Sequence, residues 1–221
     1  MSMYLIANII VCVCALIGFI FGGIKFFRPR QALYAQMITL SLGCIAFGRL
    51  FTIVSLLTGG NIINNVQIGF LGMIGSLMFF FSSNFGTVDS LLDDRSKAFL
   101  KYRLIAFAAP VAVIVMYVLL FLMSDISILW KIQGGVLALF ALPASYFNLK
   151  HLIFPDVDFG VVRCLRPYNL LALIYTAAIF TECYAMSRDN EVLTLVCCCI
   201  TGIITVAMMP LIVRGNKKWR T

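Results

Sequence analysis

The sequence predicts an all-α polytopic membrane protein: a seven-transmembrane-helix bundle with the N-terminus outside and the C-terminus cytoplasmic. Two observations support this fold class. The chain of 221 residues is 62% hydrophobic and only 12% charged, whereas a soluble domain is about a quarter charged. Its apolar residues also fall into runs of about twenty, the length that a helix needs to cross a hydrocarbon core. We therefore expect one transmembrane domain over residues 1–221.

Seven apolar runs define the expected spans, which cover about residues 4–27, 33–57, 62–85, 104–123, 126–149, 168–187 and 191–213. Short polar or basic segments separate them. No basic segment precedes the first run, and the run is too long for the apolar part of a signal peptide, so we expect it to remain as a span. In the fourth span, Pro110 predicts a kink.

Small and hydroxyl residues mark one face of the third expected span, among them Gly69, Gly72, Ser76 and Ser83. Such residues let neighbouring helices approach closely. We therefore expect this span to be the central packing helix of the bundle. Plain helix packing, without a ligand, is the simpler interpretation of the stripe.

The basic residues predict how the chain is oriented. Seven spans place the two termini on opposite sides. The first, third and fifth loops and the C-terminal tail hold 14 of the 17 Lys and Arg residues, the opposite side holds Lys131 and Arg188, and Arg49 lies inside the second span. Because basic loops stay on the cytoplasmic side, this asymmetry predicts a multi-pass protein of the cell membrane with a cytoplasmic C-terminus. The same distribution explains the net charge of +8 without a nucleic-acid partner.

The sixth span carries a polar stripe along one helical face. Its members recur every seven residues in two adjacent rows: Tyr168, Tyr175 and Glu182, and Asn169, Thr176 and Cys183. Lipid cannot satisfy such groups, so we expect the stripe to face other helices or a watery cavity.

Arg49 and Glu182 form the sharpest pair of candidate residues. Both expected spans run from inside to outside, and the two residues lie within a few ångströms of the same depth if each residue adds about 1.5 Å. The hypothesis is that they pair, directly or through water, in the outer half of the bundle. The alternative is that Arg49 extends to the headgroups while Glu182 sits at the interface.

Two sets of polar residues are candidates for function. An outward-facing cavity for a small ligand could use intramembrane polar residues, most of them in the outer halves of the spans: Arg49, Glu182, Gln67, Tyr175, Ser76 and Tyr184. A cytoplasmic gate or partner face could use Asn84, Asp89, Asn148 and Tyr168. Solvated helix ends are the simpler interpretation of most of the second set. His151, the single histidine, is expected to be a solvated residue of a cytoplasmic loop.

Three functions remain open. The chain could be a receptor or sensor that binds a small ligand from outside and acts through a cytoplasmic protein partner. It could be a small-solute transporter with a three-plus-one-plus-three helix arrangement, since Arg28-Pro29 and Arg166-Pro167 precede spans two and six in the same way. Coincidence is the simpler interpretation of this echo, because any loop that enters a span from the cytoplasm attracts basic residues and proline. It could also be a non-catalytic subunit or scaffold of a larger membrane complex. We expect no enzyme activity, no cofactor and no metal site, and membrane lipid as a partner.

Overall fold

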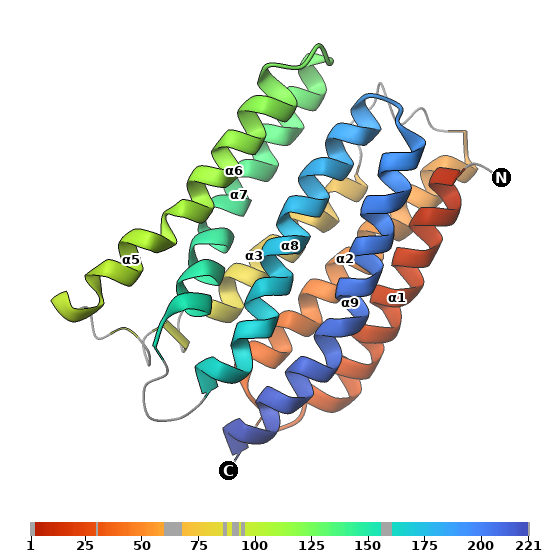
Figure 1. Ribbon diagram of the computed structural model, residues 1–221. Coiled ribbons are helices and arrows are strands. Elements are labelled where there is room, and N and C mark those ends of the chain that lie inside the picture. The colour runs from red at the N-terminus through yellow and green to blue at the C-terminus, as the bar shows by residue number, and fades with distance from the viewer. Residues whose placement is uncertain are drawn as a thin grey trace.

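Helices make up every element in the described part of the chain (Figure 1). The computed structural model describes residues 3–29, 31–59, 68–85, 88–89, 93, 96–155 and 161–220, with side chains except at 161–164 and 216–220. The elements are α1 (Met3–Phe26), α2 (Leu33–Leu57), α3 (Gly69–Asn84), η1 (Lys97–Phe99), α5 (Leu100–Ala106), α6 (Ala108–Tyr117), η2 (Val118–Leu122), α7 (Ile128–Ile153), α8 (Val161–Ser187) and α9 (Glu191–Arg220).

Six stretches of the described chain are long and apolar enough to cross a membrane, namely α1, α2, the composite segment Lys97–Leu122, α7, Leu165–Ser187 and Glu191–Gly215. Together they give the chain the architecture of a multi-pass membrane protein. The remaining helix, α3, has 16 residues and is about 24 Å long, which is less than a core of about 30 Å. The expected third span starts in residues 60–67, which lie outside the described residues, so the seventh crossing stays a prediction.

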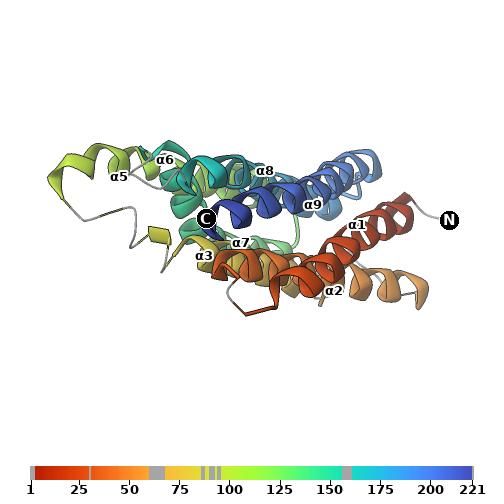
Figure 2. The same cartoon turned by 90° about the horizontal axis from the view of Figure 1, so that it is seen from below.

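Six helices close into a ring in which each packs against the next, in the order α1, α2, α3, α7, α8, α9 and back to α1. The segment α5–η2 lies outside this ring, packed mainly against α7, and forms one edge of the molecule in both views (Figures 1 and 2). The start of α1 and the end of α9 lie at opposite ends of the bundle (Figure 1).

Glycines bring α2 and α3 into close contact. A Cβ on Gly48 would lie 2.7 Å from the Gly69 carbonyl oxygen, and one on Gly72 would lie 2.5 Å from the Cys44 carbonyl oxygen. The expected close approach of the third span is therefore confirmed. The expectation that this helix is central is wrong, because α3 is one member of the ring and directs its glycines at α2.

The fourth span is interrupted near its proline, as expected. Helix α5 ends at Ala106 and α6 starts at Ala108. Ala106 is the residue whose carbonyl would receive the N–H that Pro110 lacks and would meet the proline ring. A second irregularity follows in η2, where the Met123 N–H bonds the Val118 carbonyl five residues back at 2.9 Å.

The expected loop between spans five and six is shorter than predicted. Helix α7 continues through Lys150 and His151 to Ile153, and α8 starts at Val161. Charged residues are poor candidates for a buried helix end unless they are paired. The structure supplies partners that the local sequence does not reveal, because Lys150 and His151 are 3% and 0% exposed and bond to the connector after α3.

Candidate functional site

Arg49 of α2 and Glu182 of α8 form an ion pair inside the helix ring. Arg49 Nη1 donates to Glu182 Oε1, and Nη2 donates to Oε2 at 2.6 Å. The two residues are only 4% and 0% exposed. Bidentate arginine–carboxylate pairs are strong and directional, and either charge alone would be costly here. The direct pairing predicted from the sequence is present, and the burial of Arg49 contradicts the alternative in which it extends to the headgroups.

Asn8 of α1 and Cys198 of α9 complete the surroundings of this pair. Asn8 Oδ1 accepts a hydrogen bond from Arg49 Nη1 at 3.0 Å, and Asn8 Nδ2 donates to the Tyr4 carbonyl at 2.8 Å. Cys198 Sγ lies 3.8 Å from Arg49 Nη1 and donates to Glu182 Oε1 at 3.5 Å. Four helices of the ring therefore meet at one buried charge pair.

The direction of the helices explains why these residues meet. Helices α2 and α8 run toward the end of the bundle where Tyr4 OH donates to Asp189 Oδ1 at 3.2 Å, and α1 and α9 run away from it. Counted from that end of its own helix, Arg49 lies eight residues in, Cys198 seven, and Glu182 and Asn8 five each. At about 1.5 Å per residue their depths agree within about 5 Å.

A small cavity of about 10 Å³ lies beside the pair, with Arg49, Thr52 and Gln133 among its walls. Gln133 of α7 is 6% exposed, and neither atom of its amide group has a hydrogen-bond partner in the described part of the chain. A cavity of this size, with polar groups in its wall, holds about one water molecule. Gln133 therefore presents an unused donor and an unused acceptor next to the charged pair.

Two tyrosines of α8 continue the polar groups toward the other end of the bundle. Tyr175 OH lies 2.7 Å from Ser76 Oγ, and Tyr168 OH lies 2.7 Å from Ser83 Oγ. Each serine donates its own proton to a backbone carbonyl of α3. The tyrosines are therefore the donors in both pairs. The expected polar stripe faces other helices, because all six of its members are at most 3% exposed.

Asn84, at the end of α3, joins three helices. Its Nδ2 donates to Asn148 Oδ1 of α7 at 2.7 Å and to Asn169 Oδ1 of α8 at 3.0 Å. Its Oδ1 lies 2.9 Å from His151 Nδ1. These four residues are at most 1% exposed. Solvated helix ends, the simpler interpretation of the inner candidate set, are therefore wrong for Asn84, Asn148 and Tyr168.

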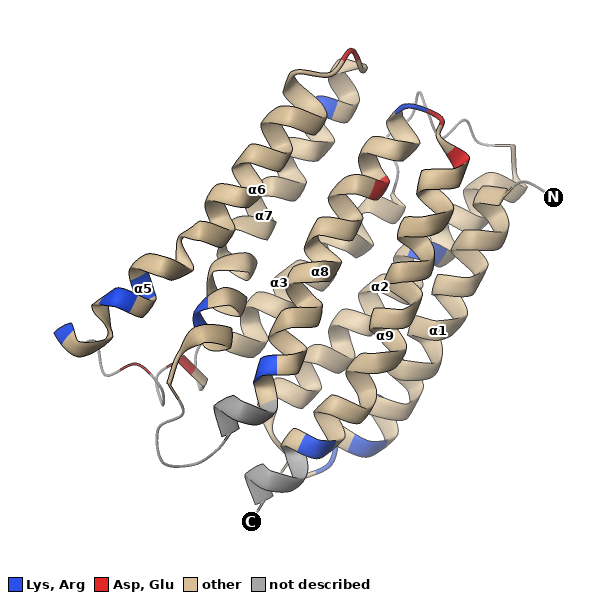
Figure 3. Cartoon of the chain, viewed as in Figure 1, with Lys and Arg blue, Asp and Glu red and all other residues tan. Residues whose placement is uncertain are grey.

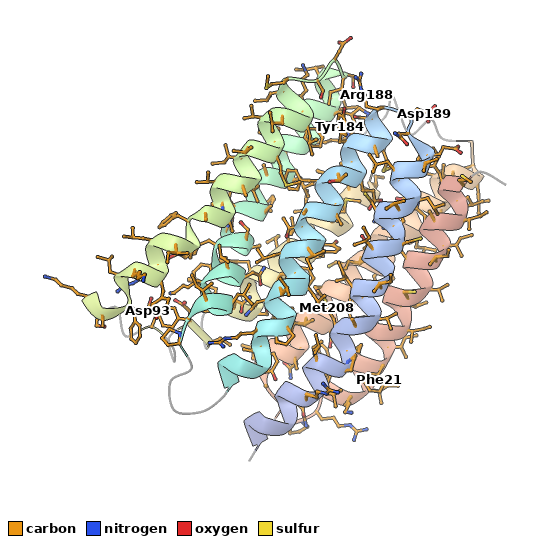
Figure 4. All side chains as sticks on the ribbon, in the orientation of Figure 1. Phe21, Asp93, Tyr184, Arg188, Asp189 and Met208 are labelled. Carbon is orange, nitrogen blue, oxygen red and sulfur yellow. The ribbon has the colours of Figure 1, made fainter. Side chains whose placement is uncertain are left out.

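Ion pairs fix the connector between α3 and η1 to α7. Lys150 Nζ lies 2.6 Å from Asp89 Oδ1 and 2.7 Å from Asp93 Oδ2. His151 Nε2 lies 3.0 Å from Asp89 Oδ1, and Arg103 Nε of α5 lies 3.6 Å from Asp93 Oδ2. We call these five residues the connector clamp. Asp93 lies at the opposite end of the bundle from Tyr184 and Arg188 (Figure 4).

The connector clamp also sets the charge state of Asp89. Burial raises the pKa of this carboxyl group, but hydrogen bonds from His151 and Lys150 and their positive charge outweigh burial. The pKa of Asp89 is therefore lower than that of an ordinary aspartate, and the group accepts hydrogen bonds as a carboxylate at neutral pH.

Buried polar residues follow one another along the bundle from the Arg49–Glu182 pair toward the connector clamp. We call this set the polar column; its members are Arg49, Glu182, Ser76, Tyr175, Ser83, Tyr168, Asn84, Asn148 and Asn169. It ends at the connector clamp, so it brings together most of the residues predicted from the sequence. Tyr184 is not among them. It lies about 200° around α8 from Glu182, is half-buried, and sits near the end of the helix (Figure 4). Gln67 lies outside the described residues.

Sequence reasoning did not assign Asn8 or Lys150 to a site and was wrong about His151. Asn8 could have been found, because it is the strongly polar residue of the first span at the depth of Arg49. His151 and Lys150 depend on contacts with a connector that lies about 60 residues away in sequence, and no local pattern indicates those contacts.

Comparison with known proteins adds no assignment: no protein-family model, no curated protein and no solved structure matches this chain.

Proposed function

We propose that the chain is a seven-span receptor or sensor of the cell membrane, which receives a small ligand on its outer side and acts on a cytoplasmic partner. The observation that supports this function best is the polar column. Its members extend from a charged pair beside a small cavity at one end to an ion-paired connector at the other. Polar and charged groups inside a membrane bundle are costly, and by default they mark functional sites.

The proposed orientation follows from the distribution of charge. Most Lys and Arg residues of the described chain lie toward the end where α1 and α9 end (Figure 3). Placing this end in the cytoplasm satisfies the preference of basic loops for that side. The connector clamp is then cytoplasmic, and the Arg49–Glu182 pair lies in the outer half.

The proposed ligand site centres on Arg49, Glu182 and Gln133. The cavity holds about one water molecule, so a larger ligand would displace groups of its walls, Arg49 among them, as it enters. A small molecule that carries an anionic and a cationic group, or a donor and an acceptor, would replace the bonds that it breaks. Gln133 adds two hydrogen-bonding atoms that already lack partners. Binding would therefore leave few buried polar groups without a hydrogen-bond partner.

The output end has two arrangements compatible with the same atomic positions. In one, both ring nitrogens of His151 donate, to Asn84 Oδ1 and to Asp89, and the ring is charged. In the other, the ring is neutral and the Asn84 amide is turned, so that Nδ2 donates to His151 Nδ1. The Nδ2 atoms of Asn148 and Asn169, which lack partners, would turn and donate to Asn84 Oδ1. A discrete two-state element of this kind is what signal transmission needs.

Ligand stabilisation combined with a flux assay tests this function. The purified protein is heated in detergent with a panel of small polar metabolites, and hits are tested for uptake into proteoliposomes. A receptor predicts a compound that raises the melting temperature of the wild type, has less effect on Gln133→Leu, and is not transported. Leu50→Ala is the matched control, because Leu50 adjoins Arg49 in sequence but is 46% exposed. Uptake of a hit compound by the wild type would instead make the protein a transporter.

The small-solute transporter is the second candidate, and two observations favour it. The ring is built from α1–α3 and α7–α9, with the fourth span outside, which fits a three-plus-one-plus-three arrangement. Transporters also use interrupted helices, and the fourth span is interrupted at Phe107 and again in η2. A subunit or scaffold role, the third candidate, predicts a stoichiometric partner on purification.

A further inference from the structure

A groove of about 500 Å³ runs between α1 and α9 on the outer surface of the ring. Gly18 and Met209 are buried on its floor, and the more exposed Ile17, Phe21 and Val206 stand along it. Phe21 is visible at this side of the bundle in Figure 4. The volume lies within the range of about 300–1,000 Å³ that small-molecule sites occupy.

The length of the groove matches one leaflet of a bilayer. On α1 it extends from Cys14, near the middle of the helix, to Lys25 in the last turn. Eleven residues of helix span about 16 Å, and half of a hydrocarbon core is about 15 Å. The groove therefore runs from the bilayer centre to one surface, along the direction of an acyl chain.

Positive charge is confined to the surface end of the groove. Lys25 and Arg214 line that end, and none of the described lining residues is acidic. Lys25 Nζ lies 5.0 Å above the centre of the Phe21 ring. Both basic side chains are exposed, and no ion pair joins either to a carboxylate in the described part of the chain. Two free cations at headgroup depth attract an anionic headgroup.

We propose that this groove binds an anionic phospholipid of the leaflet at the C-terminal end of the chain, with one acyl chain against Gly18 and Met209 and the phosphate between Lys25 and Arg214. An acyl chain without the headgroup would use only the apolar walls. The headgroup of a zwitterionic lipid also carries a positive charge, which the two basic side chains repel, so its electrostatic attraction to the site is weaker. The site is therefore selective for headgroup charge, and it lies on the opposite face of α1 and α9 from the ring interior.

Lipid competition in nanodiscs or by native mass spectrometry tests the proposal. The full chain is offered phosphatidylglycerol against phosphatidylcholine of the same chain length, and the bound lipid is quantified. The wild type is expected to retain phosphatidylglycerol selectively. The double variant Lys25→Gln/Arg214→Gln is expected to bind it roughly tenfold more weakly, with phosphatidylcholine unchanged.

Two further variants separate the site from general surface charge. Lys97→Gln/Lys101→Gln removes the same net charge from exposed residues of η1 and α5 and is expected to keep full selectivity. Val213→Trp fills the groove beside Arg214. It is expected to reduce phosphatidylglycerol binding although Lys25 and Arg214 are both retained. Equal loss in the Lys97/Lys101 control, or unchanged phosphatidylglycerol binding in both groove variants, would overturn the proposal.

Discussion

Arg49 and Glu182, which are 133 residues apart in sequence, share two hydrogen bonds at a point where α1, α2, α8 and α9 meet. Neither charge has another charged partner among the described residues. Helix α2 does not neighbour α8 in the ring, so the pair reaches across the interior of the bundle. It links two helices that are not neighbours in the ring and places charge next to a small cavity.

Removing one member of this pair should strongly destabilise the protein. Arg49→Ala leaves Glu182 as a buried, uncompensated charge, and Glu182→Ala does the same to Arg49. Each is expected to cost about 3–5 kcal/mol, measured as a fall in melting temperature or in the midpoint of denaturant unfolding in detergent. Arg188→Ala, which removes an exposed arginine that bonds the Asp125 carbonyl, should change stability by less than about 1 kcal/mol.

Gln133 should behave in the opposite way. Because both atoms of its amide are buried without partners, Gln133→Leu is expected to raise stability by about 1–3 kcal/mol, the cost of an unsatisfied buried group. Gln36→Leu is the matched control, since Gln36 Nε2 donates to the Phe26 carbonyl at 3.1 Å and its loss should destabilise. If Gln133→Leu lowers the melting temperature as Gln36→Leu does, Gln133 has a partner after all.

Glycine replacements should report the contact between α2 and α3. Gly72→Ala forces a methyl group to within 2.5 Å of the Cys44 carbonyl oxygen and 2.6 Å of Gly48 Cα, so the helices must separate. We expect a loss of about 1–3 kcal/mol. Gly23→Ala, whose methyl group would meet no atom within 4 Å, should be neutral or stabilising by up to about 1 kcal/mol. Equal melting temperatures for the two variants would contradict the close approach.

The connector clamp should make stability depend on pH through Asp89. The pKa of this carboxyl is lower in the folded protein than in the unfolded chain. The stability that Asp89 contributes is therefore fully present above its pKa in the unfolded chain, about 4. It is lost as pH falls through its lower pKa in the folded protein. Asp89→Asn should lower the melting temperature at neutral pH and flatten its decline on acidification. A variant with the same acid dependence as the wild type would exclude Asp89 as the cause.

Hydrophobic length predicted the helices because a membrane span needs little besides a run of apolar residues. The Arg49–Glu182 pair was also predictable, since depth follows from position along a straight helix. The burial of Lys150 and His151 was not, because it depends on Asp89 and Asp93 from a connector whose path is not encoded in a periodic pattern. The ring order and the lateral position of the fourth span depend on side-chain packing and were likewise beyond sequence reasoning.

The central claim is that the polar column transmits a change at Glu182 to the connector clamp. Backbone hydrogen exchange at the ends of α5 and α7 tests it most directly. Glu182→Gln is expected to increase exchange there in an otherwise wild-type chain, whereas Leu50→Ala should not. In a Tyr168→Phe/Tyr175→Phe background, which removes the two tyrosine hydroxyl donors of the column, Glu182→Gln should have little additional effect. Exchange that is unchanged by Glu182→Gln, or that rises equally in both backgrounds, would contradict the account.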